Sequence, residues 1–308
     1  MSAAPKKVGV VMGGLSPERD ISLKSGRAVC GALKDAGWDV FPLEVFQETR
    51  EDIQRLVRGA CVDVVFIAMH GGFGEDGRLQ KILEDMSVPF TGPAQEASRL
   101  AMDKAASRRI FERAGLCVPR CRVIRRRQRL LSFLHGLRYP IVVKPASQGS
   151  SIGVSLVPGW KEMSAAVVKA FQYDDTVLLE EFVKGMEITV SVLNGLALPI
   201  VAVIPKKSFF DFQAKYEKGL TEYVVPAPLE ASVAQRAQRD AVAAYQALGC
   251  RHMARVDMIV DEKGRPVILE VNTVPGLTET SLFPKAARAA GIAFSALCAK
   301  LVEMALTP

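Results

Sequence analysis

The chain has 308 residues, of which 49% are hydrophobic and 24% are charged, and its formal net charge is +7. This length predicts about two domains, and the composition is that of a globular protein rather than a fibrous or disordered one. The positive charge permits binding of polyanions, but the one dense basic run, residues 125–127 with Arg129, lacks interleaved aromatic residues. We therefore expect a solvated loop there and no nucleic-acid partner.

The N-terminal apolar run VGVVM, residues 8–12, is five residues long and is followed by Gly13 and Gly14. It is too short for a signal peptide or a membrane span, so it predicts a first β-strand and no membrane association. The six cysteines, at positions 30, 61, 117, 121, 250 and 298, form no Cys-x-x-Cys pair. We interpret them as idle thiols of a cytoplasmic protein.

From residue 7 to residue 69, apolar strands alternate with helical patterns, which predicts a parallel α/β unit. Ligands in such folds bind beyond the carboxyl ends of the strands, where the loops 13–20 and 70–77 are expected. These loops carry Glu18 and His70, a carboxylate and an imidazole at the same sheet edge. A helix cap for Glu18 and a structural role for His70 are the alternatives.

A helix that begins at the N-cap Asp103 and ends at Gly115 opens a second unit near residue 100. A strand over 139–144 then leads into the turn ASQGSSIG, residues 146–153. Its small residues suit the wrapping of phosphate oxygens by backbone N–H groups. No Gly-Lys-Ser/Thr follows, so this is not a Walker loop, and the stretch by itself favours a tight β-hairpin.

Two strands divided at Lys184 and Gly185 carry Glu180, Glu181 and Glu187, which predicts either one exposed face or hydrogen bonds to an adenine and ribose. After a strand over 196–203, the segment 205–228 is rich in Lys, aromatic residues and Gly. A loop of this length predicts a lid or a disordered segment. Tyr216 in its middle is a candidate active-site group or a surface aromatic.

The stretch 254–276 predicts a β-hairpin around the loop 261–264, with Arg255 opposite Glu270 and Asp257 opposite Ile268. Alternation predicts a polar face of Arg255, Asp257, Glu270 and Asn272. The opposite face is expected in the core and comprises Val256, Met258, Val260, Val267, Leu269 and Val271. Two carboxylates and an amide oxygen suit Mg²⁺. A solvated polar face explains the alternation equally well, but the irregular exit, Asn-Thr-Val-Pro-Gly, favours a site.

Nine motifs occur in one order along the chain: GGLSPERDIS, HGGFGEDG, TGP, MDK, KPASQGSSIG, LLEEFVKGMEITV, FFDFQAKY, the block ARVDMIVDEKGRPVILEVNTVPGLTETSLFP, and AARAAGI. In this set and order the chain resembles the ATP-grasp superfamily and, within it, the D-alanine:D-alanine ligases. The resemblance covers essentially the whole chain. It implies an N-terminal Rossmann-like parallel α/β domain, followed by a two-lobed α+β ATP-grasp fold.

The resemblance also implies the division of the chain. Residues 1–100 would be the substrate-side domain, 101–185 the central lobe with the Gly/Ser phosphate loop, and 186–308 the C-terminal lobe. The last of these would carry the lid 205–228 and the metal-binding hairpin.

The implied reaction is ATP-dependent ligation of two D-alanines through an acyl phosphate, for peptidoglycan synthesis. It would use two Mg²⁺ ions, with Mn²⁺ as a possible substitute, in a homodimer. One alternative is another ATP-grasp carboxylate–amine ligase, or one that takes D-Ser or a D-hydroxy acid second. A non-catalytic nucleotide- or nucleic-acid-binding protein is the alternative from a different class.

By the same resemblance, the metal ligands would be Asp257, Glu270 and Asn272. The ATP-binding residues would be Lys104, Lys144, Ser150, Ser151, Glu180, Glu181, Phe182, Val183, Glu187 and Phe209.

The substrate-binding residues would be Glu18 and His70 for the first D-alanine, Ser281 and Leu282 for the second, and Lys215 on the lid. Arg255 and the Gly276 N–H would stabilise the oxyanion, and Glu18, Ser150 and Tyr216 would latch the lid. Lys215 and Tyr216 favour a dipeptide product over a D-lactate ester. Phe210 and Phe212 replace common tyrosines, and Glu181 replaces a common Lys.

Overall fold

The computed structural model describes residues 6–128, 136–205 and 221–307, which form three β-sheets with helices packed on them. The first sheet is parallel and has the order β2-β1-β3. The second is antiparallel, β4-β7-β5-β6, and the third has the order β11-β10-β8-β12-β13, with β9 paired to β8. The predicted mixture of a parallel α/β part and antiparallel α+β parts is confirmed.

The parallel sheet is covered by helices on both faces, so its strands read as continuous apolar runs. Val8 and Val10 of β1 face a core shared with α1 and α11, whereas Val11 faces the core under α2 and α3. The elements of this part are β1 (Lys7–Gly13), α1 (Arg19–Asp35), β2 (Asp39–Val45), α2 (Arg50–Ala60), β3 (Val64–Ile67), α3 (Arg78–Asp85) and α4 (Gln95–Met102).

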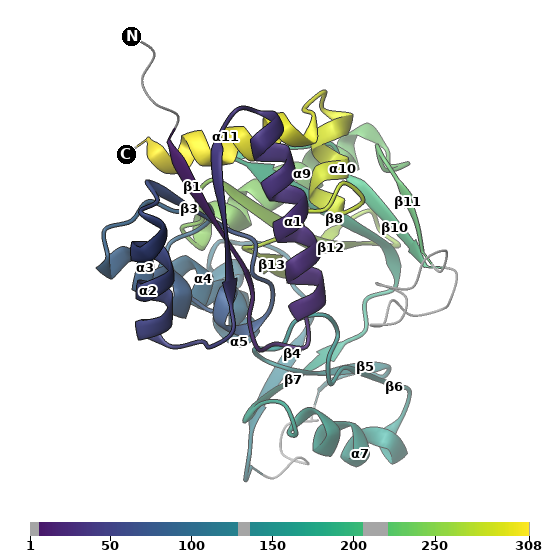
Figure 1. Cartoon of the computed structure of the whole chain (residues 1–308). Coiled ribbons are helices and arrows are strands. Elements are labelled where there is room, and N and C mark those ends of the chain that lie inside the picture. Colours follow the sequence, from purple (N-terminus) through teal and green to yellow (C-terminus); the bar gives the residue numbers. More distant parts are fainter. Residues whose placement is uncertain (1–5, 129–135, 206–220, 308) are drawn as a thin grey trace.

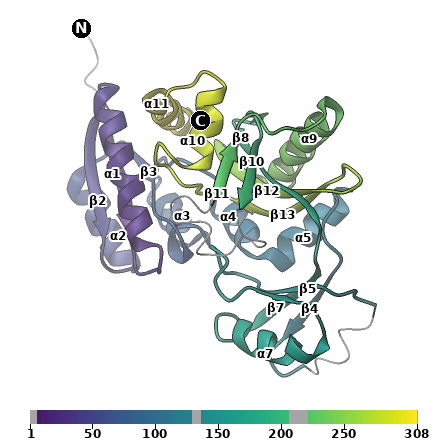
Figure 2. The same ribbon diagram turned by 90° about the vertical axis from the view of Figure 1, so that its right-hand side faces the viewer.

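The four-stranded sheet and α7 form a lobe that stands apart from the other two sheets (Figures 1 and 2). Met163 and Val167 of α7 pack on Ile141 and Val143 of β5 in the core of this lobe. Its elements are β4 (Cys121–Arg125), β5 (Ile141–Pro145), β6 (Ser155–Val157), α7 (Trp160–Ala170) and β7 (Thr176–Glu181), and α5 (Lys104–Arg113) precedes it. Asp103 caps α5 as predicted, because its carboxylate accepts from the N–H groups of Ala105 and Ala106.

The third sheet places α9 against one face, where Ala237, Ala241 and Ala244 meet Val190 and Val256 in a common core. Its elements are β8 (Gly185–Leu193), β9 (Leu196–Ala197), β10 (Val201–Pro205), β11 (Thr221–Val224), α9 (Ala231–Ala247), β12 (Met253–Asp261), β13 (Pro266–Asn272), α10 (Leu282–Ala289) and α11 (Phe294–Leu306). Two strand predictions were wrong here. The expected strand 196–203 is split into β9 and β10, and the expected loop 205–228 contains β11, paired with β10.

The register of the β12–β13 hairpin also differs from the prediction. Val260 pairs with Pro266, because the Asp261 carboxylate accepts from the N–H groups of Lys263 and Arg265 and so widens the turn. A β-bulge then shifts the pairing, so that Asp257 lies directly opposite Glu270. One assignment to the core face was also wrong: Leu269 lines the cleft described below, whereas its neighbour Ile268 is buried in the core.

Within the described ranges 6–128, 136–205 and 221–307, no single helix has the length and hydrophobicity to cross a bilayer. Helices α10 and α11 pass the same test only when taken together, and the chain bends by 101° between them. Their apolar residues, among them Phe283 and Leu297, pack in the core with α1.

His252 joins the segment before β12 to the segment between α3 and α4. Its Nδ1 accepts from the Gly92 N–H at 3.2 Å, while the neighbouring Arg251 donates to the Gly92 carbonyl and lies over the Phe90 ring. Burial and the charge of Arg251 lower the pKa of His252 from 6.5 to about 4. The ring must therefore be neutral to hold this junction.

This junction makes stability depend on pH. His252 is neutral when folded but takes up a proton near pH 6.5 when unfolded, so its contribution is complete above pH 6.5 and is lost as the pH falls to 4. From the size of the shift, we expect the free energy of unfolding to fall by on the order of 2–3 kcal/mol over this window. Urea denaturation between pH 7 and pH 4 measures it.

The matched control is His252→Asn. Asparagine tolerates the φ of +59° at this position and keeps an acceptor near the Gly92 N–H. The free energy of unfolding of this variant should fall less between pH 7 and pH 4 than that of the wild type. An equal fall in both proteins would contradict His252 as the source of the pH dependence.

Candidate active site

A cleft of about 1310 Å³ is lined by residues of the two antiparallel sheets, by the start of α1, and by the loops that follow β1 and β3 of the parallel sheet. Of the predicted site residues that the structure describes, all line this cleft. The prediction had drawn these residues from several separate segments of the chain, and the fold brings them together. Phe209, Lys215 and Tyr216, with most of the predicted lid 205–228, lie outside the described residues.

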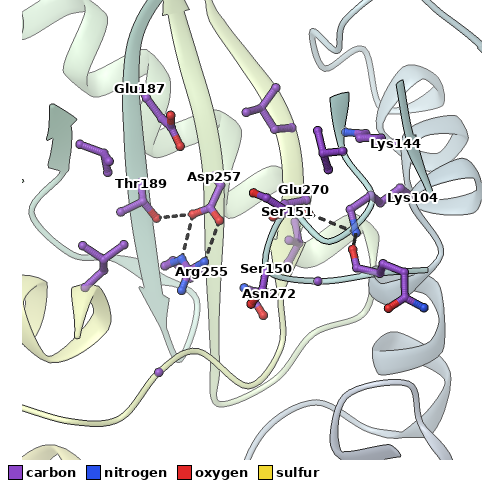
Figure 3. Close-up of a pocket in the computed structure, with 18 of the residues that line it drawn as sticks. Lys104, Lys144, Ser150, Ser151, Glu187, Thr189, Arg255, Asp257, Glu270 and Asn272 are labelled. Atoms are coloured by element: carbon purple, nitrogen blue, oxygen red, sulfur yellow. Dashed lines mark hydrogen bonds and ion pairs between the residues drawn. The ribbon is translucent and has the colours of Figure 1, made fainter. Parts of the chain in front are cut away.

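The polar face of the β12–β13 hairpin forms one wall of the cleft (Figure 3). Asp257 pairs directly with Glu270, and Arg255 pairs with Asn272, so the predicted face is confirmed although the register differs. The Arg255 guanidinium donates to both Asp257 oxygens, from Nε at 2.8 Å and from Nη2 at 2.7 Å. Glu270 Oε2 lies 3.2 Å from Lys104 Nζ. Each carboxylate therefore lies against a cation.

Thr189 of β8 is a buried residue of this wall that the sequence analysis missed. Its hydroxyl donates to Asp257 Oδ1 at 2.7 Å, because β8 and β12 pair with Thr189 opposite Asp257. Glu187 precedes it by two residues on the same face of β8 and also lines the cleft. The alternation of polar and apolar residues in EITVSVL, residues 187–193, indicates that Glu187 and Thr189 share one face of a strand. Only the pairing of β8 with β12 shows that Asp257 is the partner of Thr189.

Two buried lysines approach the opposite side of the cleft (Figure 3). Lys104, the first residue of α5, donates from Nζ to the Gln148 carbonyl at 2.8 Å. Lys144 at the end of β5 lies 2.8 Å from Glu180, which also has Arg108 at 3.9 Å. Burial lowers the pKa of Lys144, but the charges of Glu180 and Glu270 outweigh it and the net pKa is raised. Lys144 is therefore a permanent cation.

The Gly/Ser loop, residues 146–154, joins β5 to β6 as an antiparallel hairpin and lines the cleft between the lysines and Glu18. The hairpin alternative is thus correct in topology, and the loop also faces the site. Ser150 and Ser151 have φ of +52° and +59°. The Ser150 hydroxyl donates to the Glu18 carboxylate, which is the contact expected for two members of the latch.

His70 is held on both sides of its ring. Nδ1 lies 3.1 Å from the Val274 carbonyl, to which it donates, and Nε2 lies 2.8 Å from the Ser25 hydroxyl. These bonds give His70 the structural role named as the alternative, and the ring also lines the cleft, so its substrate-binding role stays a prediction.

Glu75 is a second acid near Glu18 that the sequence analysis did not single out. Its Oε1 lies 3.6 Å from His70 Nδ1, and its side chain is buried. Burial raises the pKa of Glu75 above its ordinary value, and the nearby Glu18 adds to this, while His70 opposes it. The glycine at position 71 lets the Glu18 carboxylate lie close to the backbone of this loop, because a Cβ on Gly71 would be 2.7 Å from Glu18 Oε2.

Gly276, Ser281 and Leu282 border the cleft where α10 begins. The Ser281 hydroxyl accepts from the Thr278 N–H at 3.1 Å and does not cap its own helix. Within the part of the chain that the structure describes, the N-cap residue thus leaves the backbone N–H groups in the first turn of α10 without a side-chain cap, an arrangement that suits an anion.

The predicted adenine segment follows β7. Glu181, Phe182 and Val183 line the cleft, and the Glu181 carboxylate accepts from the Arg138 N–H at 3.1 Å. The acidic residue at the place of the usual Lys is thus turned toward basic residues, with Arg120 at 3.9 Å and Arg138 Nη2 at 3.6 Å.

The oxygen atoms on the polar face of the β12–β13 hairpin determine which metal ion this wall of the cleft can hold. Among the residues that the structure describes, no group of three or more His, Cys, Asp or Glu side chains could hold a metal ion by itself. Asp257, Glu270 and Asn272 nevertheless give an all-oxygen set at the cleft, and Mg²⁺ commonly takes one or two carboxylates and completes its shell with water and phosphate. The residues therefore fit Mg²⁺.

A parallel α/β part and two antiparallel parts around a cleft with paired carboxylates and buried lysines define an ATP-grasp ligase. Solved structures share this fold. The crystal structure of D-alanine–D-alanine ligase from Bacillus anthracis complexed with ATP has a TM-score of 0.87, 33% identity, and covers 98% of this chain and 97% of its own. The VanG D-Ala:D-Ser ligase from Enterococcus faecalis has a TM-score of 0.85 at 30% identity, with 98% and 99% covered.

Sequence comparison assigns the family. Family models described as D-ala D-ala ligase N-terminus and C-terminus match residues 46–93 and 110–303. The D-alanine–D-alanine ligase of Syntrophotalea carbinolica is 44% identical over 96% of this chain and 95% of its own length. That of Geotalea uraniireducens is 44% identical over 97% and 96%. The chain belongs to the D-alanine–D-alanine ligase family.

The buried pair of Lys144 and Glu180 leads to a stability prediction. Lys144→Met leaves Glu180 buried without its nearest cation, and we expect a loss on the order of 3 kcal/mol in the free energy of unfolding. Lys144→Met with Glu180→Gln removes both charges and should recover most of the loss. Urea denaturation compares the two, and equal losses would contradict the uncompensated charge as the cause.

Proposed function

We propose that the chain joins two D-alanine molecules, with cleavage of ATP to ADP and phosphate, and so supplies D-alanyl-D-alanine for peptidoglycan synthesis. The observation that carries the proposal is the direct pairing of Asp257 with Glu270 on a cleft that also contains Lys104 and Lys144. Family membership supports it, since the curated relatives described above are D-alanine–D-alanine ligases. A location in the cytoplasm and a homodimer are part of the same proposal.

The chemistry explains why this cleft needs cations. A carboxylate is a poor electrophile, so the first D-alanine uses a carboxylate oxygen to attack the γ-phosphorus of ATP, which forms an acyl phosphate and releases ADP. The deprotonated amine of the second D-alanine then attacks the acyl carbon, and phosphate leaves. Negative charge accumulates on the phosphate and then on the tetrahedral oxygen, and fixed positive groups stabilise both.

The nucleotide would lie between the Gly/Ser loop and the β8 wall. Lys104 and Lys144 would contact its phosphates, and the N–H groups of Ser150 and Ser151 would assist them. Adenine and ribose contacts would come from Glu180, Glu181, Phe182, Val183 and Glu187, with Phe209 outside the described residues. Asp257, Glu270 and Asn272 would hold two Mg²⁺ ions, which neutralise phosphate charge when bound.

The two amino acids would bind on either side of Arg255. Glu18 would take the ammonium of the first D-alanine, with His70 beside it. Ser281 and the uncapped N–H of Leu282 would bind the carboxylate of the second, an arrangement supported by the open first turn of α10. Arg255 and the Gly276 N–H would stabilise the oxyanion.

Water must be kept from an acyl phosphate, and the contact of Ser150 with Glu18 supports a closed arrangement of the loop. Lys215 and Tyr216 would complete the latch from the lid, as the resemblance implies. The predicted alternative with a D-hydroxy acid as the second substrate is less favoured, since Lys215 and Tyr216 suit a dipeptide over an ester. D-Ser would also give a dipeptide, and the assay below separates it from D-alanine.

The function is tested by phosphate release from Mg-ATP. We expect release that depends on D-alanine and is accompanied by stoichiometric dipeptide, with L-alanine inactive. D-serine and D-lactate in the same assay separate the alternatives. An absence of phosphate release with D-alanine would overturn the proposal, and efficient release with D-lactate alone as the second substrate would redirect it.

Thr189 gives a sharper test of the metal assignment. Thr189→Val keeps the shape of the side chain but removes the hydrogen bond that orients Asp257, and groups that orient a ligand typically contribute 10- to 100-fold in metal affinity. We expect a loss on that order in the affinity for Mn²⁺ in the presence of ADP, measured by electron paramagnetic resonance. Thr189→Ser keeps the hydroxyl and should retain it. Unchanged affinity in the Val variant would contradict a metal role for Asp257.

A further inference from the structure

The turn between α7 and β7, formed by Tyr173 and Asp174, contacts both ends of the Gly/Ser loop. At the start of the loop, Asp174 Oδ2 accepts from the Ser147 N–H at 2.8 Å and from the Ser147 hydroxyl. Its other oxygen, Oδ1, accepts from the Thr176 N–H at 2.9 Å. One carboxylate thus ties the loop to the first residue of β7.

The far end of the loop rests on the same turn. Gly153, at φ +74°, lies so close to the Tyr173 ring that a Cβ on it would be 2.7 Å from Tyr173 Cδ2, and 2.8 Å from Pro145. The Tyr173 carbonyl also accepts from the Gln148 side chain at 3.2 Å. Tyr173 therefore holds Gly153 through its ring and Gln148 through its carbonyl, while Asp174 holds Ser147.

The turn itself is anchored in the lobe. The N–H of Tyr173 donates to the Ala170 carbonyl at 3.1 Å, and Ala170 is fully buried on the inner face of α7. The Ala146 N–H donates to the Thr176 carbonyl at 3.0 Å, which joins the loop base to β7 a second time. The strands β5 and β6 on either side of the loop and the helix α7 before the turn pack in one hydrophobic core.

The loop needs such support because of its backbone. Ser150 and Ser151 both lie in the left-handed region, which costs a non-glycine residue on the order of 1 kcal/mol or more. A loop released at its ends would leave this conformation. The N–H groups would then no longer point together toward a phosphate.

We infer that Asp174 and Tyr173 are positioning residues that hold the Gly/Ser loop in the shape that receives the phosphates of ATP. Neither residue borders the cleft, so they act through the loop and touch no substrate. The inference rests on the proposed function, because it takes the loop as the phosphate-binding element.

The test compares Asp174→Ala with Asp175→Ala. Asp175 is the adjacent residue, is exposed and pairs with Arg126 rather than with the loop, so it is the matched control. Hydrogen bonds to a charged group contribute about 1.5–3 kcal/mol, so Asp174→Ala should raise the KM for ATP about 10- to 100-fold. The melting temperature of the two variants should be similar, and the KM for D-alanine should change less than that for ATP.

A second readout separates positioning from a general loss of structure. A displaced loop admits water, so the ratio of phosphate released to dipeptide formed should rise in Asp174→Ala and remain at one in Asp175→Ala. Equal KM values for ATP and equal ratios in the two variants would overturn the inference. A wild-type protein without D-alanine-dependent turnover would instead overturn the proposed function.

If Asp174→Ala does not fold, milder variants test the same inference. Ser147→Ala removes only the hydroxyl contact to Asp174, and Tyr173→Leu removes the ring under Gly153, whereas Tyr173→Phe keeps it. We expect a rise of a few-fold in the KM for ATP for Ser147→Ala and Tyr173→Leu, and none for Tyr173→Phe. Unchanged KM values in the first two would contradict the inference.

Discussion

Two carboxylates held directly opposite each other are the constraint on which this cleft depends. Asp257 and Glu270 face one another across β12 and β13, and like charges in that position destabilise a sheet unless they are compensated. Arg255, which lies on β12 with Asp257, donates to Asp257, and Lys104 at the start of α5 lies against Glu270. These two positive charges supply the compensation. Lys104 also holds the Gly/Ser loop through the Gln148 carbonyl, so the charge balance of the hairpin is coupled to this loop.

The hairpin also shows how a sequence can identify a face and yet miss a register. Alternation placed Arg255, Asp257, Glu270 and Asn272 together, and they do line the cleft. The Asp261 turn and the bulge shift the pairing in succession, so Asp257 moves from Ile268 to Glu270. Strict alternation has no means to represent a bulge, and Leu269 was therefore assigned to the wrong face and Ile268 to the wrong partner.

Most of the secondary structure could be predicted because its signals are local, such as the Asp103 cap and the apolar runs of β1 and β3. The predicted cleft residues were found from motif order and family resemblance, which carry information from other chains. Thr189, Glu75 and Asp174 were missed because their importance arises from strand pairing, burial and a contact between distant turns. His252 likewise acquires its role only when its segment meets Gly92.

A carboxylate wall that carries the chemistry of the cleft, and not only its stability, requires the negative charge of Glu270. Glu270→Gln removes this charge while keeping the shape of the side chain. We expect this variant to be a folded protein whose D-alanine-dependent phosphate release is reduced by at least about a hundredfold, as happens when a group that stabilises transition-state charge is lost. Turnover close to that of the wild type would contradict it.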